Sequence, residues 1–300
     1  MNRNDPDVHI AVLIDAENVS ASYVRPLLEE VALYGTPTVK RIYADWTSSL
    51  VSGWKPVLLE NAINPVQQYS YTQGKNSSDS AMIIDAMDIL YTKDIDTFCI
   101  VSSDSDFTRL CTRLREAGKR VIGIGEQKTP RAFIQSCDKF IFIDLIANDS
   151  KKTAAQPAKK QSAQKQTQSG KSSTGEQNKQ EQQSDGSKRS RRRSGGAKAE
   201  AAEAKEAAAP AKEAKEKSEV PEDVTQLLTD AVSAAADEDG WAFLADVGNL
   251  LLKIDPSFDS RNYGFRKLTP LLAAAGQFEI DSRPTENSHI KHIFIRKIDN

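Results

Sequence analysis

Short apolar runs alternate with helical patterns over residues 8–146 of this 300-residue chain. The first run, Ile10–Ile14, is aliphatic and bounded, which is typical of a strand buried on both faces in a parallel sheet. Apolar residues then recur at helical spacing over 22–34, and Gly35 ends that segment. The alternation predicts further strands at 38–44, 65–71, 98–102, 120–124 and 139–143, and helices at 50–63, 78–91, 106–117 and 130–136.

Strands that alternate with helices imply a parallel sheet with right-handed crossovers. We therefore expect an α/β domain with a Rossmann-type parallel sheet over residues 1–149. The next segment, 150–218, consists mainly of Lys, Gln, Ser, Ala and Glu. It has almost nothing to bury, so we expect a disordered linker. Its basic run, KRSRRR (188–193), either holds a polyanion non-specifically or belongs to a solvated spacer.

Globular patterning returns over residues 219–300. Apolar spacing predicts helices at 224–235, 241–252 and 263–275, the last ending at Gly276. Two paired strands follow at 278–280 and 292–295. Three helices followed by a hairpin are the pattern of a small winged-helix domain.

Composition and charge narrow the picture further. The net charge is only −2, but the two ends are mildly acidic and the middle is basic. The three cysteines form no CxxC pair, which argues against a zinc site and fits a reducing cytosol. No apolar run approaches the roughly 20 residues that span a bilayer, and the first residues lack a signal-peptide core. We expect a cytoplasmic protein without a membrane partner.

Acidic side chains follow two of the predicted strands. Asp15 ends the first strand (LIDAENV), with Asn18 three residues later, and Asp104 and Asp106 follow the fourth (IVSSDSDF). Ligands of open parallel sheets bind outside the carboxyl ends of the strands, so these residues should meet in one crevice. Asp79, at the start of a predicted helix, can complete the group.

A cluster of like charges is stable when a cation compensates it. All the candidate ligands are oxygens, which favours Mg²⁺ or Mn²⁺ over zinc. Such an ion can activate water and neutralise charge on a phosphate, which indicates phosphodiester hydrolysis. Each aspartate taken alone could instead be a helix N-cap. On the same helix as Asp79, Asp85 is either close to the site or polar surface, and we expect Asp88 to be solvated.

Neighbouring polar residues leave alternatives open. Ser102, Ser103 and Ser105 either bond carboxylates or phosphate, or are small residues that a tight turn requires. Lys75 either touches a nucleic-acid backbone or is solvated.

Four segments together resemble the NYN domain, a branch of the PIN-like nuclease superfamily. They are IAVLIDAENV (10–19), KNSSDSAMIIDAMDIL (75–90), IDTFCIVSSDSDFTRL (95–110) and LREAGKRVIGIG (114–125). The resemblance implies a PIN-like fold in which the acidic cluster binds a divalent metal and cleaves RNA. Carried over by position, the catalytic and metal-binding residues are Asp15, Asp79, Asp104 and Asp106, and the substrate-positioning residues are Asn18, Ser103 and Lys75. The family usually has Gly in place of Ser103, and often a small or apolar residue at Ser77 or Ser78, which leaves the loop geometry in doubt.

The C-terminal segment resembles the LOTUS domain, also called OST-HTH. The supporting stretches are DGWAFLADVGNLLLK (239–253), PSFDSRNYGFRKLTPLLAA (256–274) and the closing strands. The resemblance implies a winged helix that binds RNA. Arg261, Arg266 and Lys267 lie on or beside the predicted third helix, where cationic side chains would meet phosphate. Tyr263 could stack on a base or belong to the core.

These observations favour a metal-dependent ribonuclease that hydrolyses RNA phosphodiester bonds and is targeted by its C-terminal domain. A non-catalytic RNA-binding adaptor with the same fold is the alternative. A nucleotide-binding domain is disfavoured, because no GxGxxG or Walker A motif follows the first strand. RNA is the expected partner, and a homodimer through the N-terminal domain is compatible with the resemblance, since PIN-like domains often pair.

Overall fold

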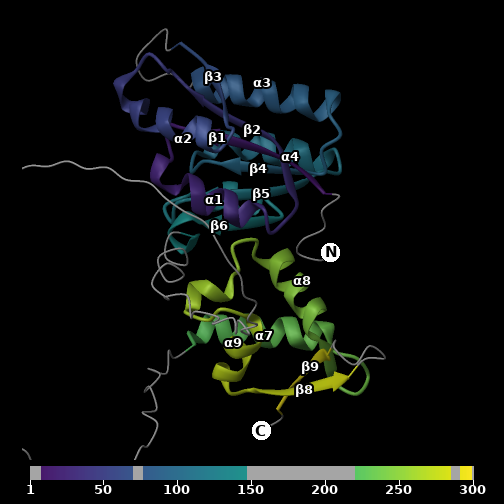
Figure 1. Ribbon diagram of the computed structural model, residues 1–300. Coiled ribbons are helices and arrows are strands. Elements are labelled where there is room, and N and C mark those ends of the chain that lie inside the picture. The colour runs from purple at the N-terminus through teal and green to yellow at the C-terminus, as the bar shows by residue number, and fades with distance from the viewer. Residues whose placement is uncertain (1–7, 70–76, 147–219, 285–290, 299–300) are drawn as a thin grey trace, which may run out of the picture. The chain divides into compact units, whose positions relative to one another are not determined.

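Figure 1 shows the computed structural model, which describes residues 8–69, 77–146, 220–284 and 291–298. The expected linker and its basic run lie outside these ranges, and so does Lys75. Within the described residues, no helix combines the length and the apolar character that a membrane crossing requires.

The N-terminal part is a six-stranded sheet in which all strand pairs are parallel, in the order β3-β2-β1-β4-β5-β6. This confirms the expected α/β class. The strands are β1 (His9–Asp15), β2 (Thr36–Ala44), β3 (Asn64–Gln67), β4 (Thr97–Val101), β5 (Arg120–Gly125) and β6 (Lys139–Phe142). The helices are α1 (Val24–Val31), α2 (Lys55–Glu60), α3 (Ser77–Thr92), α4 (Thr108–Glu116) and α5 (Arg131–Gln135).

Three of the predicted helices begin with a 3₁₀ turn rather than an α-helix. These turns cover Ala21–Tyr23, Ser49–Trp54 and Ser105–Phe107 and precede α1, α2 and α4. Strand β3 is shorter than predicted, because it pairs only with β2 and the pairing stops at Ala44↔Gln67.

The sheet is covered on both faces, as the aliphatic strands predict. Val12 packs on one face with Leu27 of α1 and Leu58 of α2. Leu13 packs on the other face with Met82 of α3 and Leu114 of α4. Alternate residues of one strand point to opposite faces, so Ile10–Ile14 of β1 are apolar at every position. Cys99, Cys111 and Cys137 are buried in these two cores as free thiols.

The C-terminal part combines three helices with an antiparallel sheet of order β7-β9-β8. One apolar core includes Leu228, Leu251, Leu271 and Ile295. The elements are α7 (Glu222–Ala235), β7 (Trp241–Phe243), α8 (Leu244–Ile254), a 3₁₀ turn (Ser260–Tyr263), α9 (Leu268–Ala275), β8 (Phe278–Pro284) and β9 (Lys291–Lys297).

Two sequence predictions in this part are wrong in detail. Residues 241–243 form strand β7 instead of the first turn of a helix, because they pair with Arg296, Ile295 and Phe294 of β9. The third helix begins at Leu268 instead of residue 263, because Gly264 adopts a left-handed conformation (φ 81°) that ends the preceding 3₁₀ turn.

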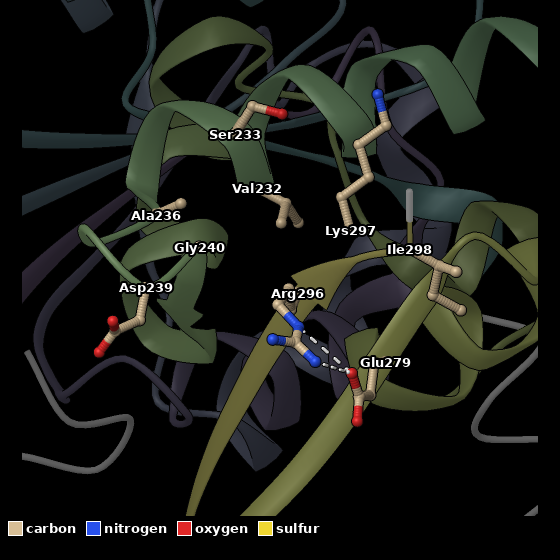
Figure 2. Close-up of a pocket in the computed structure, with 9 residues that line it drawn as sticks. All are labelled: Val232, Ser233, Ala236, Asp239, Gly240, Glu279, Arg296, Lys297 and Ile298. Atoms are coloured by element: carbon tan, nitrogen blue, oxygen red, sulfur yellow. Dashed lines mark hydrogen bonds and ion pairs between the residues drawn. The ribbon is translucent and has the colours of Figure 1, made fainter. Parts of the chain in front are cut away.

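The same sheet borders a hollow of about 610 Å³, shown in Figure 2. Its polar lining residues include Ser233, Asp239, Glu279, Arg296 and Lys297.

Candidate functional site

Sheet topology brings two polar strand ends together. β1 and β4 are adjacent and parallel, with Ile14 opposite Val101. The chain therefore leaves both strands at the same edge of the sheet, with Asp15 at the end of β1 and Ser102 directly after β4. This is the edge at which open α/β sheets bind their ligands.

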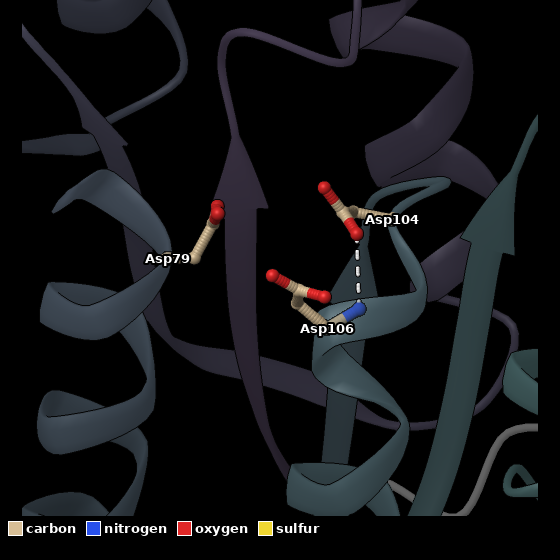
Figure 3. A group of neighbouring side chains, drawn as sticks. All are labelled: Asp79, Asp104 and Asp106. Atoms are coloured by element: carbon tan, nitrogen blue, oxygen red, sulfur yellow. Dashed lines mark hydrogen bonds between the residues drawn. The ribbon is translucent and has the colours of Figure 1, made fainter. Parts of the chain in front are cut away.

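Three carboxylates converge at this edge. Asp79, in the first turn of α3, and Asp104 and Asp106, in the turn after β4, each offer an oxygen atom, and these atoms lie within 4.8 Å of one another. Figure 3 shows the side chains pointing toward a common space from the two elements. Asp79 is buried, Asp104 is partly buried and Asp106 is exposed, so the group is open to solvent on one side.

Asp104 also has a structural role. Its Oδ1 accepts a hydrogen bond from the backbone N–H of Asp106 (2.9 Å), which caps the 3₁₀ turn Ser105–Phe107. The N-cap alternative is therefore true, but it does not exclude the acidic cluster. The same carboxylate has a second oxygen, and the cap fixes the direction in which Asp104 points.

Asp15 is almost fully buried beside this group. Its carboxylate accepts hydrogen bonds from Asn18 Nδ2 (2.6 Å), from Ser102 Oγ (2.9 Å) and from the Glu17 N–H (3.0 Å). Burial raises the pKa of Asp15, and these hydrogen bonds oppose that effect. Among the described residues, the set of oxygens within 4.8 Å does not include one from Asp15.

The raised pKa of Asp79 reflects its burial and the repulsion among the carboxylates of the cluster. Burial, followed by the negative charges of Asp15, Asp104, Glu17 and Asp106, raises the pKa of Asp79 to about 7. A carboxylate that resists ionisation near neutral pH is one that a cation would stabilise. Hard oxygen donors on two sides of one space, with excess negative charge, fit a divalent cation.

Two serines after β4 organise the site without adding charge. The Ser102 hydroxyl donates to Asp15 and accepts from the Asp104 N–H (3.1 Å), so one side chain joins the ends of β1 and β4. The Ser103 hydroxyl oxygen accepts from the N–H of Glu126 after β5 (2.8 Å). Of the alternatives that the sequence left open for these serines, a bond to a carboxylate is the one that Ser102 makes.

A glycine of β5 keeps this turn in place. A Cβ atom on Gly125 would lie 2.5 Å from the carbonyl oxygen of Ser102 and 2.9 Å from Thr129 Oγ1. Both distances are shorter than van der Waals contact allows, so any side chain at position 125 would displace the segment that carries Asp104.

Two other aspartates of α3 lie outside the cluster. Asp85 accepts hydrogen bonds from Arg41 and from the Tyr43 hydroxyl of β2. It therefore ties α3 to β2, and its side chain is only 19% exposed, so it is not simply polar surface. Asp88 is exposed, as predicted.

The cationic residues singled out in the C-terminal part lie before α9 and not on it. Arg261, in the 3₁₀ turn, donates from Nε (3.1 Å) and Nη2 (2.9 Å) to the two carboxylate oxygens of Asp259. Arg266 and Lys267 are exposed, and Lys267 is the N-cap residue directly before α9. Tyr263 packs against the core beside Phe258, with 6.0 Å between ring centres.

Comparison with known families agrees with this geometry. Residues 9–144 match the NYN domain and residues 215–290 match the OST-HTH/LOTUS domain. The chain therefore contains an NYN domain, which is of a nuclease type, followed by an OST-HTH/LOTUS domain. This confirms both resemblances.

Three similar proteins each match part of this chain. The uncharacterized protein MJ0482 of Methanocaldococcus jannaschii is 29% identical over 125 residues, which cover 39% of this chain and 48% of that protein. The chain thus spans about half the length of this relative. A Vibrio parahaemolyticus protein of unknown function, VPA0982, aligns with 47% of this chain and 96% of its own at 21% identity and a TM-score of 0.40. An uncharacterized Nitrosomonas europaea protein from locus NE0665 aligns with 32% of this chain and 90% of its own at 31% identity and a TM-score of 0.25.

Proposed function

We propose that this protein is a metal-dependent ribonuclease whose NYN domain hydrolyses RNA phosphodiester bonds and whose OST-HTH/LOTUS domain binds the RNA. One observation carries the proposal. Three carboxylates from two separate elements hold oxygens within 4.8 Å of one another at the ligand-binding edge of a parallel sheet.

Asp79, Asp104 and Asp106 would hold Mg²⁺ or Mn²⁺. When bound, the ion supplies positive charge for the phosphate and lowers the pKa of water. The cap bond from the Asp106 N–H holds Asp104 in its rotamer, so the ligand geometry exists before the ion arrives. Asp15 contributes its negative charge beside the group, and Asn18 and Ser102 fix its orientation.

The OST-HTH/LOTUS domain supplies the targeting step. Arg266 and Lys267 are exposed before α9 and would meet phosphate groups, whereas Arg261 would have to exchange its contact with Asp259 for one with RNA. Substrate-positioning roles for Asn18, Ser103 and Lys75 stay predictions, because the Asn18 amide bonds Asp15 and the Ser103 hydroxyl bonds the Glu126 N–H.

The decisive experiment compares cleavage of labelled RNAs by the full-length wild type, Asp104→Asn and Asp88→Asn, with Mn²⁺ or with EDTA. Asparagine keeps an oxygen for the cap of the 3₁₀ turn and removes the charge. We expect wild-type cleavage to require Mn²⁺ and Asp104→Asn to lower it by roughly 100-fold or more, since the charge stabilisation supplied by a metal is worth several kcal/mol. Asp88→Asn is the matched control, because it removes an exposed charge from the helix that carries Asp79.

Equal cleavage by Asp104→Asn and the wild type would contradict the proposal. Tight RNA binding without turnover on any RNA would favour the non-catalytic adaptor instead. A second readout separates the two cases, because Mn²⁺ should raise the melting temperature of the wild type more than that of Asp104→Asn.

Three further expectations belong to this proposal. Action in the cytoplasm is supported by three buried free thiols, and fractionation of the host cells would test it.

The homodimer through the NYN domain is tested by sedimentation of the full chain. The boundaries at 149/150 and 218/219 are tested by limited proteolysis, which should cut between them.

A further inference from the structure

The sheet of the OST-HTH/LOTUS domain has two very different faces. Ile295 of β9 lies opposite Ala242 of β7 and Ile280 of β8, and all three pack in the apolar core. Side chains alternate along a strand, so Phe294 and Arg296 point to the opposite face. Their cross-strand partners on β7, Phe243 and Trp241, lie on that face with them.

Planar side chains form a continuous row on this outer face. We call them the sheet platform: Trp241, Phe243, Arg283, His292, Phe294 and Arg296. The Phe243 ring lies 5.6 Å from the Phe294 ring and 5.1 Å from the His292 ring, centre to centre. The Arg283 guanidinium lies 4.2 Å from the Phe294 ring centre and 5.1 Å from that of Trp241. The Arg296 guanidinium lies 4.7 Å from the Trp241 ring centre.

Neighbouring carboxylates hold both arginines in this stacked position. Asp281 accepts from Nε of Arg283 (2.9 Å), and Glu279 accepts from Nε (3.2 Å) and Nη2 (2.6 Å) of Arg296. These bonds engage one side of each guanidinium, which has five N–H groups. Within the described part of the chain, these bonds use Nε of Arg283 and Nε and Nη2 of Arg296, and they leave Nη1 of each arginine to face other partners.

The platform is accessible. The side chains of Arg283 and Arg296 are 43% and 44% exposed, His292 is exposed, and the three aromatic rings are partly exposed. The outer face of an antiparallel sheet is usually polar, so a row of aromatic rings there departs from what folding alone requires. Those rings are also outside the set that packs on the core of this domain.

The hollow of Figure 2 continues the row beyond Arg296. Arg296 and Glu279 belong to its lining, and Gly240 faces the Arg296 side chain, to which an added Cβ would come within 3.6 Å. Its volume of about 610 Å³ lies within the range of small-molecule sites. Donors on Lys297 and acceptors on Asp239 could both meet the polar edge of a base.

We propose that the sheet platform binds single-stranded RNA by stacking unpaired bases on its aromatic rings and guanidinium groups, with the hollow accepting a nucleotide at the end of the stack. The proposal rests on the proposed function, in which RNA is the substrate, and adds a second RNA surface. Arg266 and Lys267 precede α9, which packs in the core beneath the sheet, whereas the platform is on the face that points away from that core.

The chemistry of the platform favours unpaired RNA. Aromatic rings and arginine planes accept any base, because every base has a π face. A duplex keeps its bases stacked inside and could not use them. The charges of Arg283 and Arg296 are balanced by Asp281 and Glu279, so attraction for phosphate alone would not carry the binding.

The test measures binding of the full chain to a labelled adenosine-rich oligonucleotide in EDTA, which prevents metal-dependent cleavage. We expect Trp241→Ala and Phe294→Ala each to weaken binding by roughly 5- to 100-fold, the range for loss of one stacked base. Trp241→Phe keeps a ring and should retain most of the affinity. Tyr91→Ala is the matched control, because it removes an aromatic ring that is 69% exposed in the NYN domain, and it should bind like the wild type.

Arg296→Gln covers the case in which an alanine variant fails to fold, because it keeps part of the aliphatic chain and a polar end and removes the guanidinium group and its charge. We expect a several-fold loss of affinity. Folded variants that bind the oligonucleotide like the wild type would overturn the proposal and favour a protein partner on this face. Failure of the platform and failure of the nuclease are distinguishable, because Asp104→Asn should strongly lower cleavage yet bind the oligonucleotide in EDTA normally.

Discussion

The two domains place their characteristic side chains by the same rule and with opposite energetics. In the NYN domain, parallel strands deliver carboxylates to one edge, where they repel one another and raise the pKa of Asp79 to about 7. In the OST-HTH/LOTUS domain, antiparallel pairing sets rings and guanidinium groups side by side on one face, where they attract one another. The carboxylates of the NYN domain need a bound cation to offset their repulsion, whereas the rings and guanidinium groups of the second domain are stable without a ligand.

This contrast teaches which domain should respond to which condition. The acidic edge should be sensitive to pH and divalent ions, because its strain is electrostatic. The sheet platform should respond little to divalent ions, because its rings and guanidinium groups attract one another and each arginine is already bonded to a carboxylate. Three measurements test this difference.

The largest effect should come from separate core deletions. Ile295 and Ile100 are fully buried in the cores of different domains. We expect Ile295→Ala and Ile100→Ala each to lower the free energy of unfolding of their own domain by about 2–5 kcal/mol. Denaturant unfolding followed with and without Mn²⁺ measures this. Mn²⁺ should still stabilise the NYN domain of Ile295→Ala against denaturant. If both variants instead unfold in the same single transition, the two domains do not unfold independently and the prediction is contradicted.

A smaller effect should appear in the pH dependence of metal-free stability. The pKa of Asp79 is raised in the fold, so the folded state holds its proton where the unfolded chain has lost it. Its contribution to stability is then complete below about pH 4 and disappears as pH rises to about 7. After allowance for solvent screening, we expect a loss of about 2 kcal/mol between these limits. Thermal unfolding in EDTA at both ends of this range measures it.

Two comparisons identify the source of that pH effect. Asp79→Asn should abolish this part of the slope, and Mn²⁺ should reverse it in the wild type, since the ion stabilises the ionised cluster. Trp241→Ala should leave the slope unchanged. An identical slope in Asp79→Asn and the wild type would contradict the link between the acidic cluster and stability.

The smallest effect distinguishes the two RNA surfaces of the C-terminal domain. Loss of a phosphate contact reduces the slope of log affinity against log salt by about 1, whereas loss of a stacked base does not. We expect Arg266→Ala and Lys267→Ala each to show the reduced slope and Trp241→Ala to keep the wild-type slope at lower affinity. Binding titrations in EDTA over a range of salt concentrations measure this. A reduced slope in Trp241→Ala would mean that the platform acts through charge.

Features built from local patterns could be predicted from the sequence. The aliphatic strands predict a parallel sheet with both faces covered by helices, because a strand such as Ile10–Ile14 can be apolar throughout only when both its faces are buried. The acidic edge followed from the position of each aspartate at a strand end or helix start, together with the direction of the sheet.

Features that depend on distant partners could not be predicted in this way. Trp241–Phe243 runs directly into the apolar spacing of α8, and only pairing with β9, some 50 residues later, makes it a strand. The sheet platform is unpredictable for the same reason, since the predicted strand 292–295 pairs with only one partner in a hairpin and the pairing with β7 brings Trp241 and Phe243 beside it. The two alternatives for Asp85 stayed open at the level of the sequence, because its partners, Arg41 and Tyr43, lie in a strand more than 40 positions away.

Gly125 is a position of the NYN domain at which we expect substitutions to be poorly tolerated. It offers no functional group, yet any other residue there would push against the Ser102 carbonyl and displace the turn of Asp104. In a saturation screen for inactive alleles, position 125 should therefore score with the aspartates themselves. Substitutions near the acidic edge are therefore limited in two ways. The aspartates must keep their negative charge, and Gly125, two strands away from β1, must leave room for the backbone of the turn.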